Sequence, residues 1–254
     1  MNIRYKAFAL GTAFLGAVTM MSVGCRSYSD VAAHYSNKHI KENNNQVTAQ
    51  IPEASELGYI LMALSDIGNT DNEMIDKGSP YYQEVMSYFG RFKDHKAVKL
   101  INRDLKQDPA IFTHLRNGLY AYRFNDRNRM VLKTDYRIDL NPIDLRVYTG
   151  AIEDFMKDSK FRSFYKQHEA FYNDIIKQES AQLTMNAVSA NMTKRYRTPF
   201  NSYQVIMSPL MKGYNSSVEL DGRGFRECLI FAQTANQVML YSANQAVVQN
   251  AYND

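Results

Sequence analysis

Tyr203-Gln204-Val205-Ile206-Met207 (residues 203–207) is the stretch that decides the fold class of this chain. Its β-branched and aromatic residues are typical of a strand, which ends at Ser208-Pro209. A polar loop over residues 213–224 separates it from a second apolar run, Arg226 to Phe231, and we expect the two runs to pair as antiparallel strands. The sequence therefore predicts a small antiparallel sheet near residues 200–233.

Upstream of Pro199, apolar residues recur at helical spacing. The pattern over residues 57–64 and 82–89 predicts two amphipathic helices, the first ending at Gly68 and the second capped by Ser79. Further helices are expected at Asp94, Pro109, Asn141-Pro142, Ser159 (opening the longest helical stretch) and Asn236. The predicted fold class is therefore α+β, with a helix-rich N-terminal two-thirds followed by the small antiparallel sheet. Residues 51–254 form a single domain in this prediction.

Composition restricts the class of protein without defining a reaction. The chain has 254 residues, 45% of them hydrophobic and 22% charged, which is ordinary for a folded domain and excludes wholesale disorder. Its 30 basic and 26 acidic side chains leave a net charge of only +4. This balance gives no reason to expect a nucleic-acid partner.

The N-terminus predicts export and membrane attachment. Arg4 and Lys6 precede an uncharged stretch over residues 7–21, which is typical of a signal peptide and too short to span a bilayer. Ser22-Val23-Gly24-Cys25 then resembles the lipobox of bacterial lipoproteins, although Ser22 stands where Leu is usual. We expect residues 1–24 to be a lipoprotein signal peptide and Cys25 to carry the lipid. The alternative is an ordinary cleaved signal with an incidental cysteine.

This N-terminus places the protein in the bacterial cell envelope, facing the periplasm or the cell surface. Residues 25–50 are polar, with Asn43-Asn44-Asn45 at their centre, and are expected to form a flexible tether between the lipid and the domain. His34 and His39 lie in this segment at a spacing that does not suit a metal site.

Three other features have a structural and a functional interpretation. Cys228 lies in an apolar run, so a buried, inert thiol is favoured over a nucleophile. His168 lies on an aromatic stripe, which favours a hydrogen-bonded core histidine over a ligand or base. The basic segment 194–197 suits the negative end of a helix dipole, with phosphate or lipid head groups as the alternative partners.

A family resemblance adds to these predictions. It is carried by Pro52-Glu53 before an apolar helix, by residues 88–98, by Phe164-Tyr165-x-x-His168-x-x-Phe171-Tyr172, and by residues 208–214. Together they resemble a bacterial family of unassigned function, secreted or lipid-anchored, that is zincin-like, that is, similar to zinc metallopeptidases. The resemblance covers roughly residues 51–233.

The resemblance implies a peptide or protein substrate, held along an edge strand, and zinc bound by a His-Glu-x-x-His helix. Tyr203, Val205 and Met207 are the candidate substrate-strand residues. His168-Glu169 does not complete the zinc motif, because Tyr172 stands at its last position. We therefore expect no zinc in this chain and no zinc-peptidase activity from it alone. The two interpretations are a piece of a longer protein, in which zinc and its ligands are possible, and a member of the family that has lost the site. The alternative is a non-catalytic envelope lipoprotein that binds a protein or a glycan.

Overall fold

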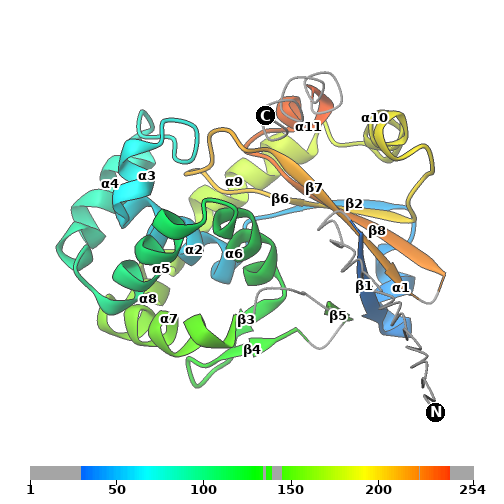
Figure 1. The fold of residues 1–254 in the computed structure, drawn as a ribbon. Coiled ribbons are helices and arrows are strands. Elements are labelled where there is room, and N and C mark those ends of the chain that lie inside the picture. Colours follow the sequence, from blue (N-terminus) through cyan, green and yellow to red (C-terminus); the bar gives the residue numbers. More distant parts are fainter. Residues whose placement is uncertain (1–29, 134–135, 139–144, 223, 241–254) are drawn as a thin grey trace, which may run out of the picture.

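The computed structural model describes residues 30–133, 136–138, 145–222 and 224–240. A body of helices lies beside a twisted sheet, with further helices on both faces of the sheet (Figure 1). The predicted α+β class is confirmed. None of the helices within these residues has both the length and the apolar character needed to cross a bilayer.

Six strands form the main sheet, in the order β2-β6-β8-β7-β1-β5. They are β1 (Asp30–Tyr35), β2 (Gln46–Gln50), β5 (Tyr136–Ile138), β6 (Ser202–Ile206), β7 (Ser216–Gly222) and β8 (Phe225–Phe231). Strands β2, β6 and β8 are parallel, as are β1 and β7, whereas β8 pairs with β7 and β1 with β5 in antiparallel fashion. A separate hairpin joins β3 (Tyr122–Phe124) to β4 (Met130–Leu132).

The sheet differs from the prediction in its size and its pairing. The predicted strands, β6 and β8, are parallel neighbours rather than an antiparallel pair. The antiparallel partner of β8 is β7, which occupies residues 216–222 of the predicted loop, because a short connection through Gly224 (φ 74°) favours a local hairpin. Gly222 is required where β7 meets β1, since a side chain there would collide with the Ala33 backbone oxygen.

The predicted tether is wrong from residue 30 onward. Strand β1, helix α1 (Asn37–Asn43) and β2 fold into the sheet region. Ser36 caps α1, and Asn45 at φ 60° turns the chain into β2, so the polar residues are helix-cap and turn residues. Residues 1–24 and Cys25 lie outside the described residues, so their predicted roles stay predictions.

The remaining helices are α2 (Glu53–Leu64), α3 (Asp66–Thr70), α4 (Pro80–Phe89), α5 (Lys96–Gln107), α6 (Ile111–Tyr120), α7 (Arg146–Asp158), α8 (Phe161–Gln167), α9 (Glu169–Ser180), α10 (Met185–Tyr196) and α11 (Ala235–Leu240), with a 3-10 turn at Gly90–Phe92. Helix α2 is the centre of the helical body, and all but the first of its residues are buried.

Several helices begin or end at residues other than those predicted. The Ser79 cap on α4 is confirmed, but α2 ends at Leu64 rather than Gly68. His95 rather than Asp94 caps α5, because its Nδ1 accepts the Ala97 N–H at 3.1 Å. Ser159 ends α7 instead of opening the next helix.

The two faces of the sheet are covered by different helices. His39 of α1 and Arg116 of α6 contact side chains on one face, at Glu227 and Phe231 of β8. Tyr196 of α10 meets Ser217 of β7 on the other face. The sheet is therefore buried on both faces. This explains why every residue of β6 is buried.

Candidate functional site

The feature of the helical body that packing alone does not explain is a buried glutamate, Glu56. It lies in the first turn of α2, and its exposed fraction is 0%. Helix α2 is covered on all sides, since Tyr59, Met62 and Leu57 are also buried. A helix buried all round leaves a glutamate no route to solvent.

Two tyrosines from two other helices reach this carboxyl group. The Tyr81 hydroxyl of α4 donates to Glu56 Oε1 at 2.8 Å and lies 2.6 Å from the Tyr172 hydroxyl of α9. Because Tyr81 has one proton and gives it to Glu56, the Tyr172 hydroxyl donates to Tyr81. The second carboxyl oxygen, Glu56 Oε2, has no hydrogen-bond partner among the described residues.

Burial raises the pKa of Glu56 to about 7, and this effect outweighs three that lower it. These are the hydroxyls of Ser208 and Tyr81 and the charge of His168. Burial also raises the pKa values of Tyr81 and Tyr172, so both remain neutral donors. Glu56 therefore exchanges its proton near neutral pH, unlike an ordinary carboxyl group.

His168 borders this centre. It is hydrogen-bonded, as predicted, but it is half-buried at the rim of the core rather than within it. Its ring stacks on Phe164 at 4.1 Å between centroids. Nδ1 lies 2.9 Å from the Phe164 carbonyl oxygen, and Nε2 lies 2.7 Å from a Glu84 carboxyl oxygen. Both neighbours accept hydrogen bonds, so the ring makes both bonds when it carries two protons. In that form its charge favours ionised Glu56.

Tyr81 connects the buried carboxyl group to the surface. Its hydroxyl meets Glu56, and its ring stacks on Phe171, with centroids 5.4 Å apart and planes 28° apart. Phe171 is 40% exposed, which is unusual for a large apolar side chain. Two rings thus separate Glu56 from solvent on this side. We call Glu56, Tyr81, Tyr172 and Ser208 the Glu56 centre.

A second buried glutamate, Glu227, lies in the sheet and accepts hydrogen bonds from more side chains than Glu56 does. Its Oε2 accepts from Ser202 at 2.6 Å and from Gln204 at 3.2 Å, and lies 3.2 Å from His39 Nε2. Gln204 in turn donates to Asn43 at 3.0 Å. The carboxylate stands between the serine and the histidine, so the imidazole is not placed to activate Ser202 as a nucleophile. This cluster fastens α1 to β6 and β8.

A groove of ≈ 550 Å³ lies on the outer side of the helical body. It is lined by Leu64, Ser65, Asp66, Asn69, Met86, Gly90, Lys93, Asp94, Val98, Lys99 and Asn102. Its polar groups are engaged within the fold: Asn102 donates to Asp66 at 2.9 Å, and Asn69 donates to the Ser65 carbonyl oxygen at 3.0 Å. The groove therefore offers few unpaired groups for recognition.

The structure does not support the predicted substrate strand. Tyr203, Val205 and Met207 are buried at 0% exposure. Strand β6 pairs with β2 along one edge and with β8 along the other, and the Met207 N–H bonds to the Gln50 carbonyl oxygen at 2.9 Å. An extended peptide needs a free strand edge, which β6 does not have, so this prediction is wrong.

Cys228 is buried at 0% exposure, as predicted, and burial raises the pKa of its thiol. The thiolate that a nucleophile requires is therefore disfavoured. Among the residues that the structure describes, no three or more His, Cys, Asp or Glu side chains gather as metal ligands. The zinc site that the family resemblance implies is therefore not formed by these residues.

The sequence prediction missed Glu56, although one signal pointed to it. Residues 57–64 place apolar side chains at Tyr59, Met62 and Ala63 as well as on the predicted inner face. A helix that is apolar on all sides is buried, so a glutamate one turn from its start is expected to be buried too. Tyr81 and Tyr172 come from distant segments, and their approach to Glu56 depends on the tertiary structure.

Comparisons with known proteins found no matching family model, curated protein or solved structure. The fold defines a mixed α/β protein with a buried, hydrogen-bonded glutamate of raised pKa in its helical body.

Proposed function

We propose that this protein is a lipid-anchored hydrolase of the bacterial cell envelope, acting on a peptide or protein, in which Glu56 donates and accepts the proton. The observation that carries the proposal is Glu56 itself, fully buried, with Oε2 unpartnered and its pKa raised to about 7. A general acid or base is most effective when its pKa lies near the working pH. Perturbed carboxyl groups of this kind concentrate at functional sites.

The arrangement of the Glu56 centre supports this role. Tyr81 holds one carboxyl oxygen in place, which leaves the other oxygen available for a substrate group or a water molecule. Glu227 also has one unpartnered oxygen, Oε1, but its Oε2 accepts from both Ser202 and Gln204, which suits a structural carboxylate. Access requires the rings of Tyr81 and Phe171 to move, and Phe171 is already exposed.

The anchor is the second part of the proposal, and it is tested separately. Arg4, Lys6 and the apolar stretch before Cys25 support export and acylation at Cys25. Cys25→Ala is expected to move the protein from the membrane fraction to the soluble fraction and to abolish labelling by a fatty-acid analogue. Unchanged fractionation with no lipid label on the wild-type protein would contradict the anchor.

The resemblance to zinc peptidases supports hydrolysis as the reaction class, but the proposal assigns no step to zinc. The described residues do not assemble a metal site. What this chain contributes is the proton transfer between Glu56 and the attacking water or the leaving amine, and the positioning of Glu56 by Tyr81.

The test uses the protein isolated from membranes and a mixture of unstructured peptides, with cleavage read by mass spectrometry. Glu56→Gln keeps the shape of the side chain and removes the titrating proton, so cleavage is expected to fall about 10²-fold or more. Glu42→Gln is the control, since Glu42 is exposed on α1 and has no contact with the Glu56 centre or with His168 among the bonds of the described residues. Equal cleavage by Glu56→Gln and wild type would refute the role of Glu56.

The groove on the outer side of the helical body favours a second candidate function, binding of a protein or a glycan without catalysis. Its volume suits a short chain segment or a few sugar rings. It ranks second because Asn69, Asn102 and Asp66 already bond within the fold. Saturable binding of a glycan that Asn69→Ala weakens, with no peptide cleavage by the wild type, would favour this candidate.

A further inference from the structure

Because segment 30–50 is folded, the chain between Cys25 and the domain is short. Strand β1 begins at Asp30, five residues after Cys25. A chain spans at most about 3.3–3.6 Å per residue, so Cys25 lies within about 18 Å of the start of β1. With a lipid on Cys25, as proposed above, the surface around this end of β1 is held near the head groups.

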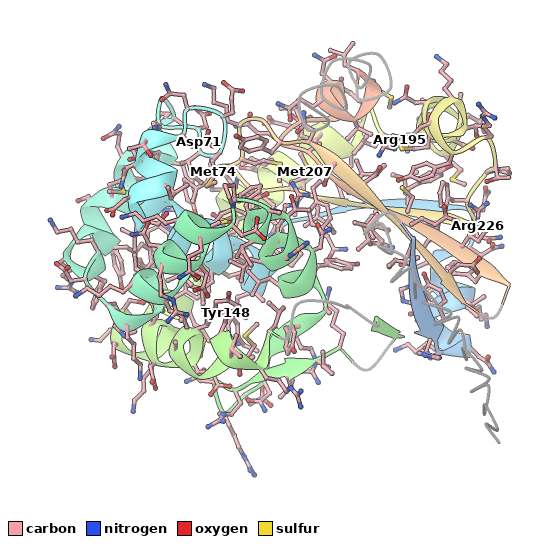
Figure 2. All side chains as sticks on the ribbon, viewed as in Figure 1. Asp71, Met74, Tyr148, Arg195, Met207 and Arg226 are labelled. Carbon is pink, nitrogen blue, oxygen red and sulfur yellow. The ribbon has the colours of Figure 1, made fainter. Side chains whose placement is uncertain are left out.

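The C-terminal end of α10 lies beside that surface. Asp30 of β1 pairs with Glu219 of β7, and Glu219 accepts from Arg226 Nε at 2.9 Å. Arg226 also donates to the Pro199 carbonyl oxygen at 3.1 Å, just beyond α10. The Tyr196 hydroxyl, in the last turn of α10, lies 2.7 Å from Ser217 of β7. Figure 2 shows Arg195 and Arg226 on this sheet side of the molecule, away from the helical body.

The charge of this segment is one-sided. From Ala181 to Val218 the sequence contains Lys194, Arg195, Arg197 and Lys212 and no acidic residue. Lys194 and Arg197 are exposed. Lys194 and Arg195 also stabilise the negative end of the α10 dipole, which accounts for them in part.

The dipole of α10 does not explain why an arginine stands at position 197. Arg197 is the residue that ends α10, at φ 60° and ψ 0°, a left-handed conformation in which Gly or Asn is usual. A long cationic side chain at this position carries a local conformational cost. It also extends the basic cluster beyond the end of the helix.

We propose that Lys194 and Arg197, the exposed basic residues at the end of α10, face the anionic phospholipid head groups of the membrane that holds the anchor. Arg195 is half-buried, and its guanidinium lies over the Tyr196 ring at 5.3 Å, so it is not included. The proposal rests on the proposed lipidation of Cys25. Anionic lipid attracts each nearby Lys or Arg by about 1 kcal/mol, which corresponds to about fivefold in the population of the docked state per residue. The docked domain presents a fixed side to the membrane, with the helical body beyond the sheet.

The test compares two positions in the lipidated full-length protein in vesicles. Thr198→Cys places a fluorophore beside the basic end of α10, and Gln167→Cys places it on α8 in the helical body; both residues are exposed. The native Cys228 is buried and is not labelled. A quencher is attached to the lipid head groups, in vesicles of phosphatidylcholine alone or with 30% phosphatidylglycerol.

The expected result is stronger quenching at position 198 than at position 167 in the anionic vesicles. The difference should fall with added salt and in neutral vesicles. Adding Lys194→Glu and Arg197→Glu to Thr198→Cys is expected to lower the docked fraction at least tenfold, while the protein remains bound through its lipid.

Two outcomes would overturn the proposal in distinguishable ways. Equal quenching at the two positions, in a protein that carries the lipid label and floats with the vesicles, refutes the docking and leaves the anchor intact. Absence of the lipid label from the wild-type protein refutes the anchor, and the docking with it.

Discussion

The helical body and the sheet each bury one glutamate, and they differ in the number of donors to it. Each leaves one carboxyl oxygen, Glu56 Oε2 or Glu227 Oε1, without a hydrogen-bond partner among the described residues. In the sheet, Ser202 and Gln204 donate to one oxygen of Glu227, and His39 lies within hydrogen-bonding distance of it. In the helical body, the hydroxyl of Tyr81 donates to Glu56 Oε1 at 2.8 Å, and burial raises the pKa of Glu56 to about 7. A buried carboxylate that accepts several hydrogen bonds stabilises the fold. One with few donors has a raised pKa and can gain or lose its proton near neutral pH.

The difference follows from what each carboxyl group joins. Glu227 links strands that are far apart in sequence and fastens α1 to them, so its role is structural. Glu56 lies where α2, α4 and α9 meet, and these helices already pack through apolar side chains. Glu56 is not needed for that packing, and burial of its charge opposes folding.

The largest effect is expected at Glu227. Glu227→Ala removes the acceptor shared by Ser202, Gln204 and His39 and leaves their donors buried without it. We expect a loss of about 3–5 kcal/mol in the free energy of unfolding, measured by urea denaturation at pH 7. Glu42→Ala, on the exposed surface of α1, is the control and should change stability by less than about 0.5 kcal/mol. A loss no larger than that of the control would show that the cluster does not stabilise the sheet.

The next effect has the opposite sign. The folded-state pKa of Glu56, about 7, lies above its usual value of 4.5, so the native state binds the proton more tightly than the unfolded chain. The stability from this proton is complete below pH 4.5 and is lost as the pH rises through 7. Glu56→Gln cannot ionise, so its stability relative to the wild type should rise by about 3 kcal/mol between pH 4 and pH 8.

This comparison across pH cancels the fixed cost of the new amide group, since that cost is the same at both values. Glu84→Gln, at an exposed carboxylate, should show no comparable change. A pH-independent effect of Glu56→Gln would mean that Glu56 titrates normally, and the contrast between the two glutamates would fail.

A smaller effect on the free energy of unfolding is expected when a single serine hydroxyl is removed, and it should differ between the sheet and helix α2. Ser202 donates to the Glu227 carboxylate at 2.6 Å, so Ser202→Ala should cost about 2 kcal/mol in the free energy of unfolding. Ser55 of α2 is equally buried, but its hydroxyl has no partner among the described residues. Ser55→Ala should therefore be neutral or slightly stabilising. Similar losses for both variants would contradict the assignment of the serine as a donor to a charged group.

The sequence predicted the helical body better than the sheet because helices are local. Ser79 as a cap and the apolar spacing of α4 depend on residues within ten positions of each other. The pairing of β6 with β8, and of β1 with β7 across almost the whole chain, leaves no such local trace. Strand β1 (Asp-Val-Ala-Ala-His-Tyr) does not alternate, and β2 (Gln-Val-Thr-Ala-Gln) alternates over only five residues among polar neighbours, so neither gives a clear strand signal.

The candidate site was hidden for the same reason. Glu56 is one charged residue near the start of a helix, where acidic side chains are common on exposed surfaces. Its buried, hydrogen-bonded environment forms only in the folded protein, where Tyr81 donates to it and Tyr172 contacts Tyr81. The burial of Cys228 was predicted correctly because its apolar neighbours are adjacent in sequence, whereas His168 keeps its predicted hydrogen bonds and stacking but is only half-buried.

The smallest expected effect tests how Tyr81 sets the proton affinity of Glu56. Tyr81→Phe removes the hydroxyl that donates to Glu56 Oε1 at 2.8 Å and that accepts from Tyr172. This hydrogen bond lowers the pKa of Glu56, so its loss should move the pKa above 7, followed by the infrared band of the protonated carboxyl group. The cost in stability should be about 1 kcal/mol, because the bond is a neutral one below pH 7. Tyr82→Phe is the matched control, since that neighbouring hydroxyl bonds Asn69 rather than Glu56. If both variants titrate like the wild type, the Tyr81 hydroxyl does not lower the pKa of Glu56, and burial sets that pKa with no opposing contribution from this neighbour.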